Sequence, residues 1–134
     1  MTLRIAEIFR SLQGEATSAG WPTVFVRLAG CNLRCLYCDT AWAWTGGEEL
    51  DLDSIRSRIR AAGPTQRVCL TGGEPLLQRE PLLALAAALI VDGHDVSMET
   101  NGSLPVDNLP DKLVAVIDVK TPASGMSGVM NFEN

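Results

Sequence analysis

Residues 23–39, TVFVRLAGCNLRCLYCD, join an apolar run directly to three closely spaced cysteines. The Val, Phe and Leu residues of positions 23–29 predict a buried strand. Cys31, Cys35 and Cys38 follow with the spacing C-x3-C-x2-C. A closed tetrahedral zinc site takes four protein ligands, and an ordinary four-iron cluster also takes four. Three thiolates on one short loop therefore predict a [4Fe-4S] cluster whose fourth iron stays open for chemistry.

A zinc knuckle is the alternative, with Cys69 or His94 as its fourth ligand. Cys69 lies within an apolar run, where a cysteine is usually a small core residue. His94 follows Gly93 at a predicted turn, where solvation is the simpler expectation. The open cluster is therefore the preferred interpretation.

Length, composition and charge predict one domain that does not bind nucleic acid. The chain has 134 residues, of which 46% are hydrophobic, which suits a single domain over residues 1–134 with a real core. The formal net charge is -5, and no basic run like those that neutralise phosphates is present in the sequence. Direct nucleic-acid binding is therefore not expected.

Neither a membrane span nor an export signal is expected. The longest apolar stretch, residues 82–91, has about half of the roughly 20 residues that a spanning helix needs. Arg4, Glu7 and Arg10 interrupt any apolar region at the N-terminus. Clustered cysteines without an export signal favour metal binding or catalysis in a reducing cytoplasm.

Alternating strand and helix patterns predict an α/β fold with a parallel sheet. Strands are expected at residues 3–9, 23–29, 67–71, 95–99 and 113–119, and a loop at residues 11–15. A helix is expected over residues 51–62, capped by Asp51 or Asp53. A second helix starts near Pro81 and runs through residue 91, and its apolar surface nearly all round predicts thorough burial.

The expected strands place their polar residues on one face of the sheet, towards the strand ends. Alternation puts these groups together: Arg27 with Phe25, Thr71 with Cys69 and Gly73, Glu99 with Ser97 and Asn101, and Asp118 with Lys120. Ligand sites of α/β sheets and barrels lie at the carboxyl ends of the strands. The sequence therefore predicts a polar site at this edge.

The run Thr71-Gly-Gly-Glu-Pro75 stands at one of these strand ends, where Gly72 and Gly73 let the backbone approach a ligand closely. Together with the cysteine spacing and an aromatic residue, Tyr37, just before Cys38, it resembles the radical S-adenosylmethionine (radical SAM) superfamily. That resemblance implies a partial (β/α) barrel, truncated here at the C-terminus, with SAM bound on the open iron.

A finer resemblance is to the 7-carboxy-7-deazaguanine synthase family. Local motifs carry it in family order along the chain: Ser11-Leu-Gln-Gly-Glu15, Phe25-Val-Arg-Leu-Ala-Gly-Cys-Asn-Leu-Arg-Cys35 with Cys38-Asp-Thr40, Leu70-Thr-Gly-Gly-Glu-Pro-Leu76, and Glu99-Thr-Asn-Gly102 with Asp118-Val-Lys-Thr-Pro122. The resemblance implies radical conversion of 6-carboxy-5,6,7,8-tetrahydropterin to 7-carboxy-7-deazaguanine with loss of ammonia, in queuosine precursor biosynthesis. It also implies Mg2+, an electron donor such as flavodoxin or ferredoxin, and a homodimer.

Matching motif positions imply the site residues. The cluster would be held by Cys31, Cys35 and Cys38. SAM would be lined by Tyr37, Cys38, Asp39, Gly72, Gly73, Glu99 and Lys120. The pterin would be held by Leu12, Gln13, Gly14, Arg27 and Thr71. Thr40 would offer its hydroxyl to Mg2+.

Elementary chemistry suits these implied roles and leaves simpler ones open. Mg2+ prefers oxygen ligands, although Thr40 would equally cap the turn after the cysteines. An inward Arg27 needs a partner, and a substrate carboxylate or a structural pair with Glu15 or Glu99 would supply it. Gln13 offers both donors and acceptors to an aminopyrimidinone edge.

Other functions are kept as alternatives. A glycyl-radical-enzyme activase has the same cluster but a protein substrate. A small iron-sulfur electron carrier would have a cluster that does not respond to SAM. A zinc-stabilised binding module would hold no iron.

Overall fold

The computed structural model describes residues 1–17, 19–30 and 46–118. Within these ranges no helix is long and apolar enough to cross a membrane.

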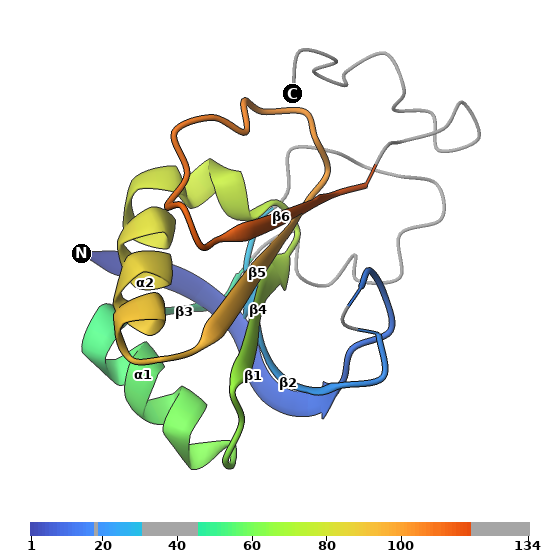
Figure 1. The fold of residues 1–134 in the computed structure, drawn as a ribbon. Coiled ribbons are helices and arrows are strands. Elements are labelled where there is room, and N and C mark those ends of the chain that lie inside the picture. The colour runs from blue at the N-terminus through green and yellow to red at the C-terminus, as the bar shows by residue number, and fades with distance from the viewer. Residues whose placement is uncertain (18, 31–45, 119–134) are drawn as a thin grey trace.

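A six-stranded mixed sheet forms the centre of the fold (Figure 1). The strands are β1 (Thr2–Leu12), β2 (Pro22–Leu28), β3 (Glu48–Asp51), β4 (Arg67–Gly72), β5 (Asp95–Thr100) and β6 (Val114–Ile117), in the spatial order β3-β1-β2-β4-β5-β6. Neighbours among β2, β4, β5 and β6 pair in parallel, whereas β1 is antiparallel to both β2 and β3. The predicted parallel α/β core is confirmed, with an antiparallel pair added at one side.

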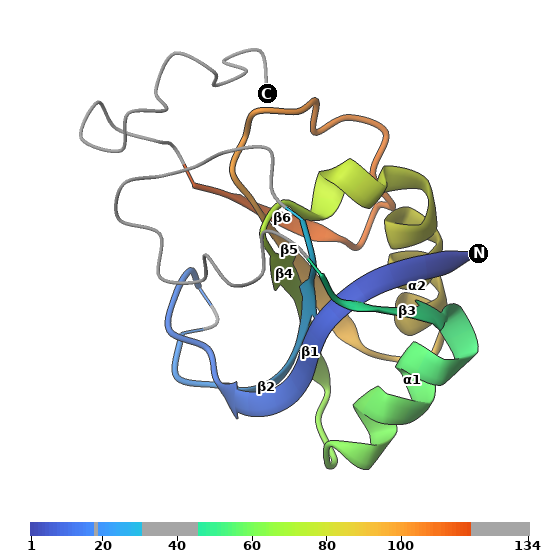
Figure 2. The same cartoon turned by 180° about the vertical axis from the view of Figure 1, so that it is seen from behind.

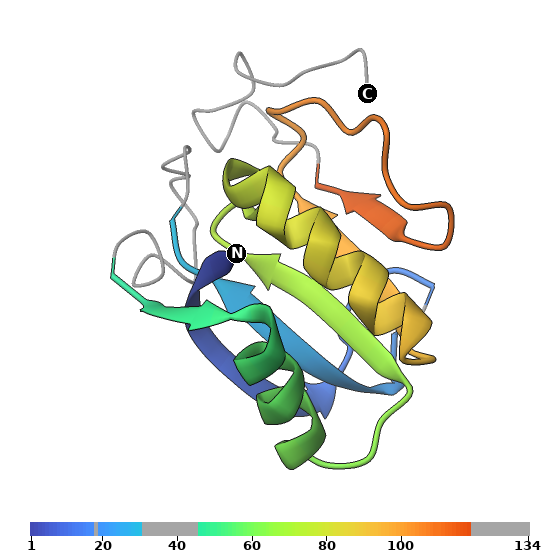
Figure 3. The same cartoon turned by 90° about the vertical axis from the view of Figure 1, so that its left-hand side faces the viewer.

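Both helices, α1 (Leu52–Ala61) and α2 (Arg79–Val91), cover the same face of the sheet (Figure 3). The sheet contributes Val24, Val26, Leu28, Val68, Leu70, Val96 and Met98 to the core that they cover. The helices contribute Ile55, Ile59, Leu82, Leu85 and Leu89. The alternation of these positions shows that the other side chains of β2, β4 and β5 point to the opposite, helix-free face.

Helix α1 begins as the sequence predicts. The Asp51 carboxylate accepts a hydrogen bond from Ser54 N at 2.7 Å, so that Asp51 and not Asp53 is the N-cap. On the helix-free side, which Figure 2 shows from behind, the loop between β1 and β2 brings Ala16 and Thr17 close to Ser97 of β5 and Val116 of β6.

The structure confirms Pro81 in the first turn of α2 and corrects the predicted burial of this helix. The helix begins at Arg79, and a proline within the first turn is tolerated because it lacks only an N–H that the helix does not use. A 3-10 helix, η2 (Pro75–Gln78), precedes it. The expected thorough burial is wrong at Val91, which is 85% exposed. A helix on the outside of a two-layer fold buries one face only.

The structure also extends the predicted strands. Ser11 and Leu12, expected in a loop, continue β1 by pairing with Thr23 and Pro22. Strand β3 was not expected, because only Leu50 of its four residues is buried. Its pairing with β1, from Thr2↔Asp51 to Ile5↔Glu48, closes the antiparallel side of the sheet.

Candidate active site

The helix-free face carries the polar groups that the sequence places there. Parallel pairing aligns Arg27 of β2 with Thr71 of β4. The Thr71 hydroxyl donates to the Glu99 carboxylate of β5 at 3.3 Å. The prediction that these three side chains share one face is therefore confirmed. They lie near the carboxyl ends of parallel strands, where α/β folds bind ligands.

Arg27 has a structural partner that differs from both predicted ones. Its Nε lies 3.0 Å from Glu7 Oε1, and not against Glu15 or Glu99. Glu7 pairs with Arg27 in the β1–β2 register, which the sequence alone does not specify. The guanidinium also lies 5.8 Å from the centroid of the Phe9 ring, which stacks on Phe25. These contacts fix the orientation of Arg27 on the helix-free face.

Cys69 lies on the same face and is fully buried. Burial, and after it the neighbouring Glu99 carboxylate, raise the pKa of the Cys69 thiol to about 12, although hydrogen bonding with Ser97 and Gln13 opposes the rise. The thiol is therefore neutral at ordinary pH. His94, the other proposed zinc ligand, has Nδ1 3.3 Å from Gln66 O. Within the described residues no three His, Cys, Asp or Glu side chains gather to hold a metal ion.

The predicted substrate loop contributes one buried side chain. Gln13 is 5% exposed, whereas Leu12 at the end of β1 is 64% exposed. Backbone hydrogen bonds hold Gln13 in place, from Gln13 N to Trp21 O at 3.0 Å and from Gly20 N to Gln13 O at 2.7 Å. Open space surrounds the position where Gly14 would carry a Cβ. The structure thus brings Gln13, but not Leu12, to the polar face beside Cys69.

Gly72 and Gly73 meet the neighbouring strand. A Cβ on Gly72 would lie 2.3 Å from Leu28 O, and the residue has a φ of +140°. Gly73 N donates to the same Leu28 carbonyl at 3.3 Å. The close approach of β4 to β2 is therefore sufficient to require glycine at position 72. The predicted contact of both glycines with SAM stays a prediction.

Glu74 is the most deeply buried acidic residue of the described ranges, with 0% of its surface exposed. Its Oε1 accepts from Leu76 N at 3.0 Å and from the Thr100 hydroxyl at 2.7 Å, and its Oε2 accepts from Asn101 N at 2.7 Å. Glu74 belongs to the Gly-Gly-Glu-Pro stretch, but only Gly72 and Gly73 of that stretch were predicted to contact a ligand. A signal was available, because an acidic residue between Gly73 and Pro75 must find hydrogen-bond donors if it is buried.

Two further residues, Arg4 and Gln78, were not predicted from the sequence. Their side chains hydrogen-bond residues close to either end of the cysteine segment. Arg4 donates to Gly46 O through Nε at 3.2 Å and Nη2 at 2.5 Å. Gln78 Nε2 donates to Arg4 O at 3.1 Å and to Ala29 O at 3.2 Å, and Gln78 Oε1 accepts from Arg4 N at 2.8 Å. No local signal marks these residues, because the contacts join positions 42, 49 and 74 residues apart in sequence.

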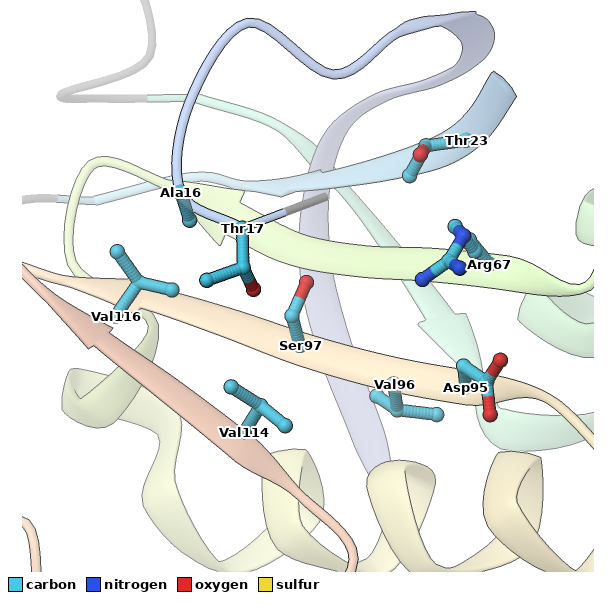
Figure 4. Close-up of a pocket in the computed structure, with 9 residues that line it drawn as sticks. All are labelled: Ala16, Thr17, Thr23, Arg67, Asp95, Val96, Ser97, Val114 and Val116. Carbon is cyan, nitrogen blue, oxygen red and sulfur yellow. The ribbon is translucent and has the colours of Figure 1, made fainter. Parts of the chain in front are cut away.

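A hollow of about 90 Å³ lies farther towards the amino ends of the strands on the same face (Figure 4). Arg67 and the hydroxyl-bearing Thr17 and Ser97 line it, and Figure 4 shows these side chains pointing into the same space. None of the predicted site residues is among those that line it. The other predicted residues, namely Cys31, Cys35, Tyr37, Cys38, Asp39, Thr40 and Lys120, lie outside the described ranges.

Known proteins resemble this chain along most of its length. It is 43% identical to the 7-carboxy-7-deazaguanine synthase of Koribacter versatilis over 132 residues, which cover 98% of this chain and 58% of that protein. It is 49% identical to the 7-carboxy-7-deazaguanine synthase of Methanospirillum hungatei over 130 residues, or 97% of this chain and 55% of that protein. The chain therefore spans slightly more than half the length of these relatives.

A solved structure is also similar to this chain. The crystal structure of QueE from Escherichia coli matches with a TM-score of 0.80 and 28% sequence identity, over 90% of this chain and 61% of that chain. The sheet described above is thus a partial radical SAM barrel. The family model of the Radical SAM superfamily matches residues 25–121, a range that contains the cysteine motif, Gly72, Gly73 and Glu99. The chain belongs to the radical SAM superfamily.

Proposed function

We propose that this chain performs the reaction of 7-carboxy-7-deazaguanine synthase. In this reaction 6-carboxy-5,6,7,8-tetrahydropterin becomes 7-carboxy-7-deazaguanine with loss of ammonia, as a step of queuosine precursor biosynthesis. The observation that carries the proposal is the 43% to 49% identity, over nearly the whole chain, to proteins of that name. The aligned polar face of Arg27, Thr71 and Glu99 supports it, because the substrate is a small polar molecule.

The donor sets of the sequence fit the groups that this reaction needs. Thiolates suit iron-sulfur clusters, so the proposal assigns the cluster to Cys31, Cys35 and Cys38. A hydroxyl oxygen suits Mg2+, which the proposal assigns to Thr40. When bound, the cluster supplies the electron that cleaves SAM, and SAM supplies the carbon radical that removes a hydrogen from the substrate.

The protein binds and orients the two small molecules. The proposal assigns the pterin to Leu12, Gln13, Gly14, Arg27 and Thr71, and SAM to Tyr37, Cys38, Asp39, Gly72, Gly73, Glu99 and Lys120. Glu7 and Phe9 fix the Arg27 guanidinium, whose parallel N–H groups can meet the substrate carboxylate. The hydrogen bond between Thr71 and Glu99 links the pterin set to the SAM set, so it would align one molecule relative to the other.

The proposal extends to partners and setting. An electron donor such as flavodoxin or ferredoxin would reduce the cluster, and two copies would form a homodimer. Three clustered cysteines stay available as ligands only under reducing conditions, so the proposal places the protein in the cytoplasm. The proposal also treats residues 1–134 as a single domain.

Anaerobic reconstitution tests the proposal. The chain is loaded with iron and sulfide, reduced with dithionite, and incubated with SAM, Mg2+ and 6-carboxytetrahydropterin. We expect the absorbance of 7-carboxy-7-deazaguanine and released ammonia, both abolished in Cys35→Ser. SAM cleavage without a deazaguanine product would contradict the substrate and favour an activase. A cluster whose spectrum ignores SAM would favour an electron carrier.

A further inference from the structure

We propose that Glu74 is a positioning residue. It holds the carboxyl ends of β2, β4 and β5 in fixed positions relative to one another and so places the residues that bind SAM. The inference rests on the proposed SAM site and adds a residue that touches neither SAM nor the pterin in that proposal. Its basis is the set of hydrogen bonds that join Glu74, which follows β4, to η2 and to the ends of β2 and β5.

The backbone of this segment is tied to β2. Glu74 N donates to Gly30 O at 2.8 Å, and Gly73 N donates to Leu28 O at 3.3 Å. Gly30 directly precedes Cys31 in the sequence. Glu74 therefore holds Gly30, the residue that directly precedes the first cysteine, in a fixed position relative to the end of β4.

The side chain of the same residue is tied to β5. Thr100 is the last residue of β5, and its hydroxyl lies 2.7 Å from Glu74 Oε1. Asn101 N, one residue farther along the chain, lies 2.7 Å from Oε2. Glu99, which the proposed function assigns to SAM, directly precedes this pair. One residue thus joins two strand ends: its backbone N–H binds Gly30, after β2, and its carboxylate binds the end of the strand that carries Glu99.

The bonding pattern needs a carboxylate. Each of the three groups described around the Glu74 oxygens is a donor, namely Leu76 N, the Thr100 hydroxyl and Asn101 N. A glutamine of the same size keeps one acceptor oxygen and turns an NH2 group towards a donor. A buried donor without an acceptor is costly, and the amide NH2 group would leave one donor without its acceptor. Glu74→Gln therefore changes the positions of the strand ends with little change in volume.

SAM affinity, measured by equilibrium binding to the reconstituted full chain, separates positioning from plain stability. We expect Glu74→Gln to weaken SAM binding by about tenfold or more, because one buried bond of the bridge is lost. Leu85→Ala is the matched control, since Leu85 lies in α2 within the core beneath the sheet and is fully buried. It is expected to lower stability and leave SAM affinity unchanged.

A second variant covers the case in which Glu74→Gln does not fold. Thr100→Val removes the hydroxyl that donates to Glu74 Oε1 and keeps the side-chain shape. We expect Thr100→Val to lower SAM affinity by about threefold, which is a smaller loss than the one expected for Glu74→Gln. Unchanged SAM affinity in the folded variants, with stability reduced as in Leu85→Ala, would overturn the inference.

Amide hydrogen exchange keeps this test separate from the test of the proposed function. If the wild-type chain itself does not bind SAM, the proposed function fails, and exchange alone decides the inference. Relative to the global stability of each variant, Asn101 N–H should then exchange faster in Glu74→Gln than in Leu85→Ala. Equal protection of Asn101 in the two variants would overturn it.

Discussion

Gly72 lies beside Leu28 of β2 with no room for a side chain, and its φ of +140° is one that other residues rarely adopt. The cost of a side chain here has two sources, since the backbone would be strained and the Cβ would lie within 2.3 Å of Leu28 O. Neither β2 nor β4 can move away easily, because each is paired on both sides within the sheet.

Gly72→Ala is therefore expected to destabilise the protein by about 3 kcal/mol or more. Gly14→Ala is the matched control, because nothing lies within 4 Å of the added Cβ. Its effect should stay within about 0.5 kcal/mol. Urea denaturation followed by circular dichroism measures both. Equal effects of the two substitutions would contradict the close approach of the strands.

Cys69 should make the stability of the fold depend on alkaline pH. Because burial raises the pKa of this thiol to about 12, the unfolded chain releases a proton at lower pH than the folded one. The stabilisation is complete below the ordinary thiol pKa and is lost as pH rises towards 12. We expect a slope of up to about -1.4 kcal/mol per pH unit between roughly pH 9 and pH 11, in excess of the slope of Cys69→Ala.

Urea denaturation of both proteins over this pH range is the measurement. The cysteines of the cluster segment are present in both proteins, so the difference in slope isolates Cys69. Identical slopes would show that the thiol ionises as easily in the folded protein as in the unfolded chain.

The candidate site was predictable where it depends on local patterns. Alternation along β2, β4 and β5 was sufficient to place Arg27, Thr71 and Glu99 on one face. Glu7 could not be predicted as the partner of Arg27, because that pairing depends on the register between β1 and β2. Arg4 and Gln78 were unpredictable for the same reason, since their contacts exist only after distant strands and helices have assembled.

At the scale of elements, α2 is apolar in sequence but two-sided in the fold. Leu82, Leu85 and Leu89 are fully buried against the sheet, whereas Val91 is 85% exposed. The helix therefore stabilises the fold through one face. The burial predicted from its composition was too high, because Ala and Leu on the outer face favour a helix even where no other element packs against them.

Leu85→Ala should lower the free energy of unfolding by about 3 kcal/mol, because it leaves a cavity between α2 and the sheet. Val91→Ala on the exposed side of the same helix should change it by less than about 0.5 kcal/mol. Thermal and urea denaturation of the two variants provide the comparison. A large effect at Val91 would mean that a further part of the protein covers this side of α2.

Long apolar strands were predicted well, and short polar ones were not. β2, β4 and β5 each carry several buried residues, so their patterns stand out in sequence. β3 contains Glu48 and Glu49 and becomes a strand only because β1 offers a free edge to pair with. The 3-10 helix η2 depends on Glu74, whose side chain caps it by accepting from Leu76 N.

For the whole molecule, the make-up of the core of the described residues has a testable consequence. The core described here is formed by side chains of the sheet and of α1 and α2, from Leu3 to Leu113, and it needs no metal to exclude water. Small metal-dependent domains, by contrast, unfold when their metal is removed.

Removal of iron by a chelator under reducing conditions should therefore abolish visible absorbance and SAM binding while the fold persists. Far-UV circular dichroism should be unchanged, and the thermal midpoint should shift by less than about 5 °C. Cys35→Ser, prepared without iron, is the control and should match the chelated protein. Unfolding on chelation would instead support a zinc- or iron-stabilised module.

The loop between β1 and β2 contributes one side chain to both the proposed substrate recognition and the stability of the fold. Phe25 and Cys69 are buried on the face that carries no helix, and Gln13 from this loop lies against Cys69. A side chain proposed to recognise the substrate therefore also shields the sheet from water. Mutations that retune recognition at Gln13 would weaken the fold at the same time, so evolution towards a different substrate would require compensating changes elsewhere in the protein.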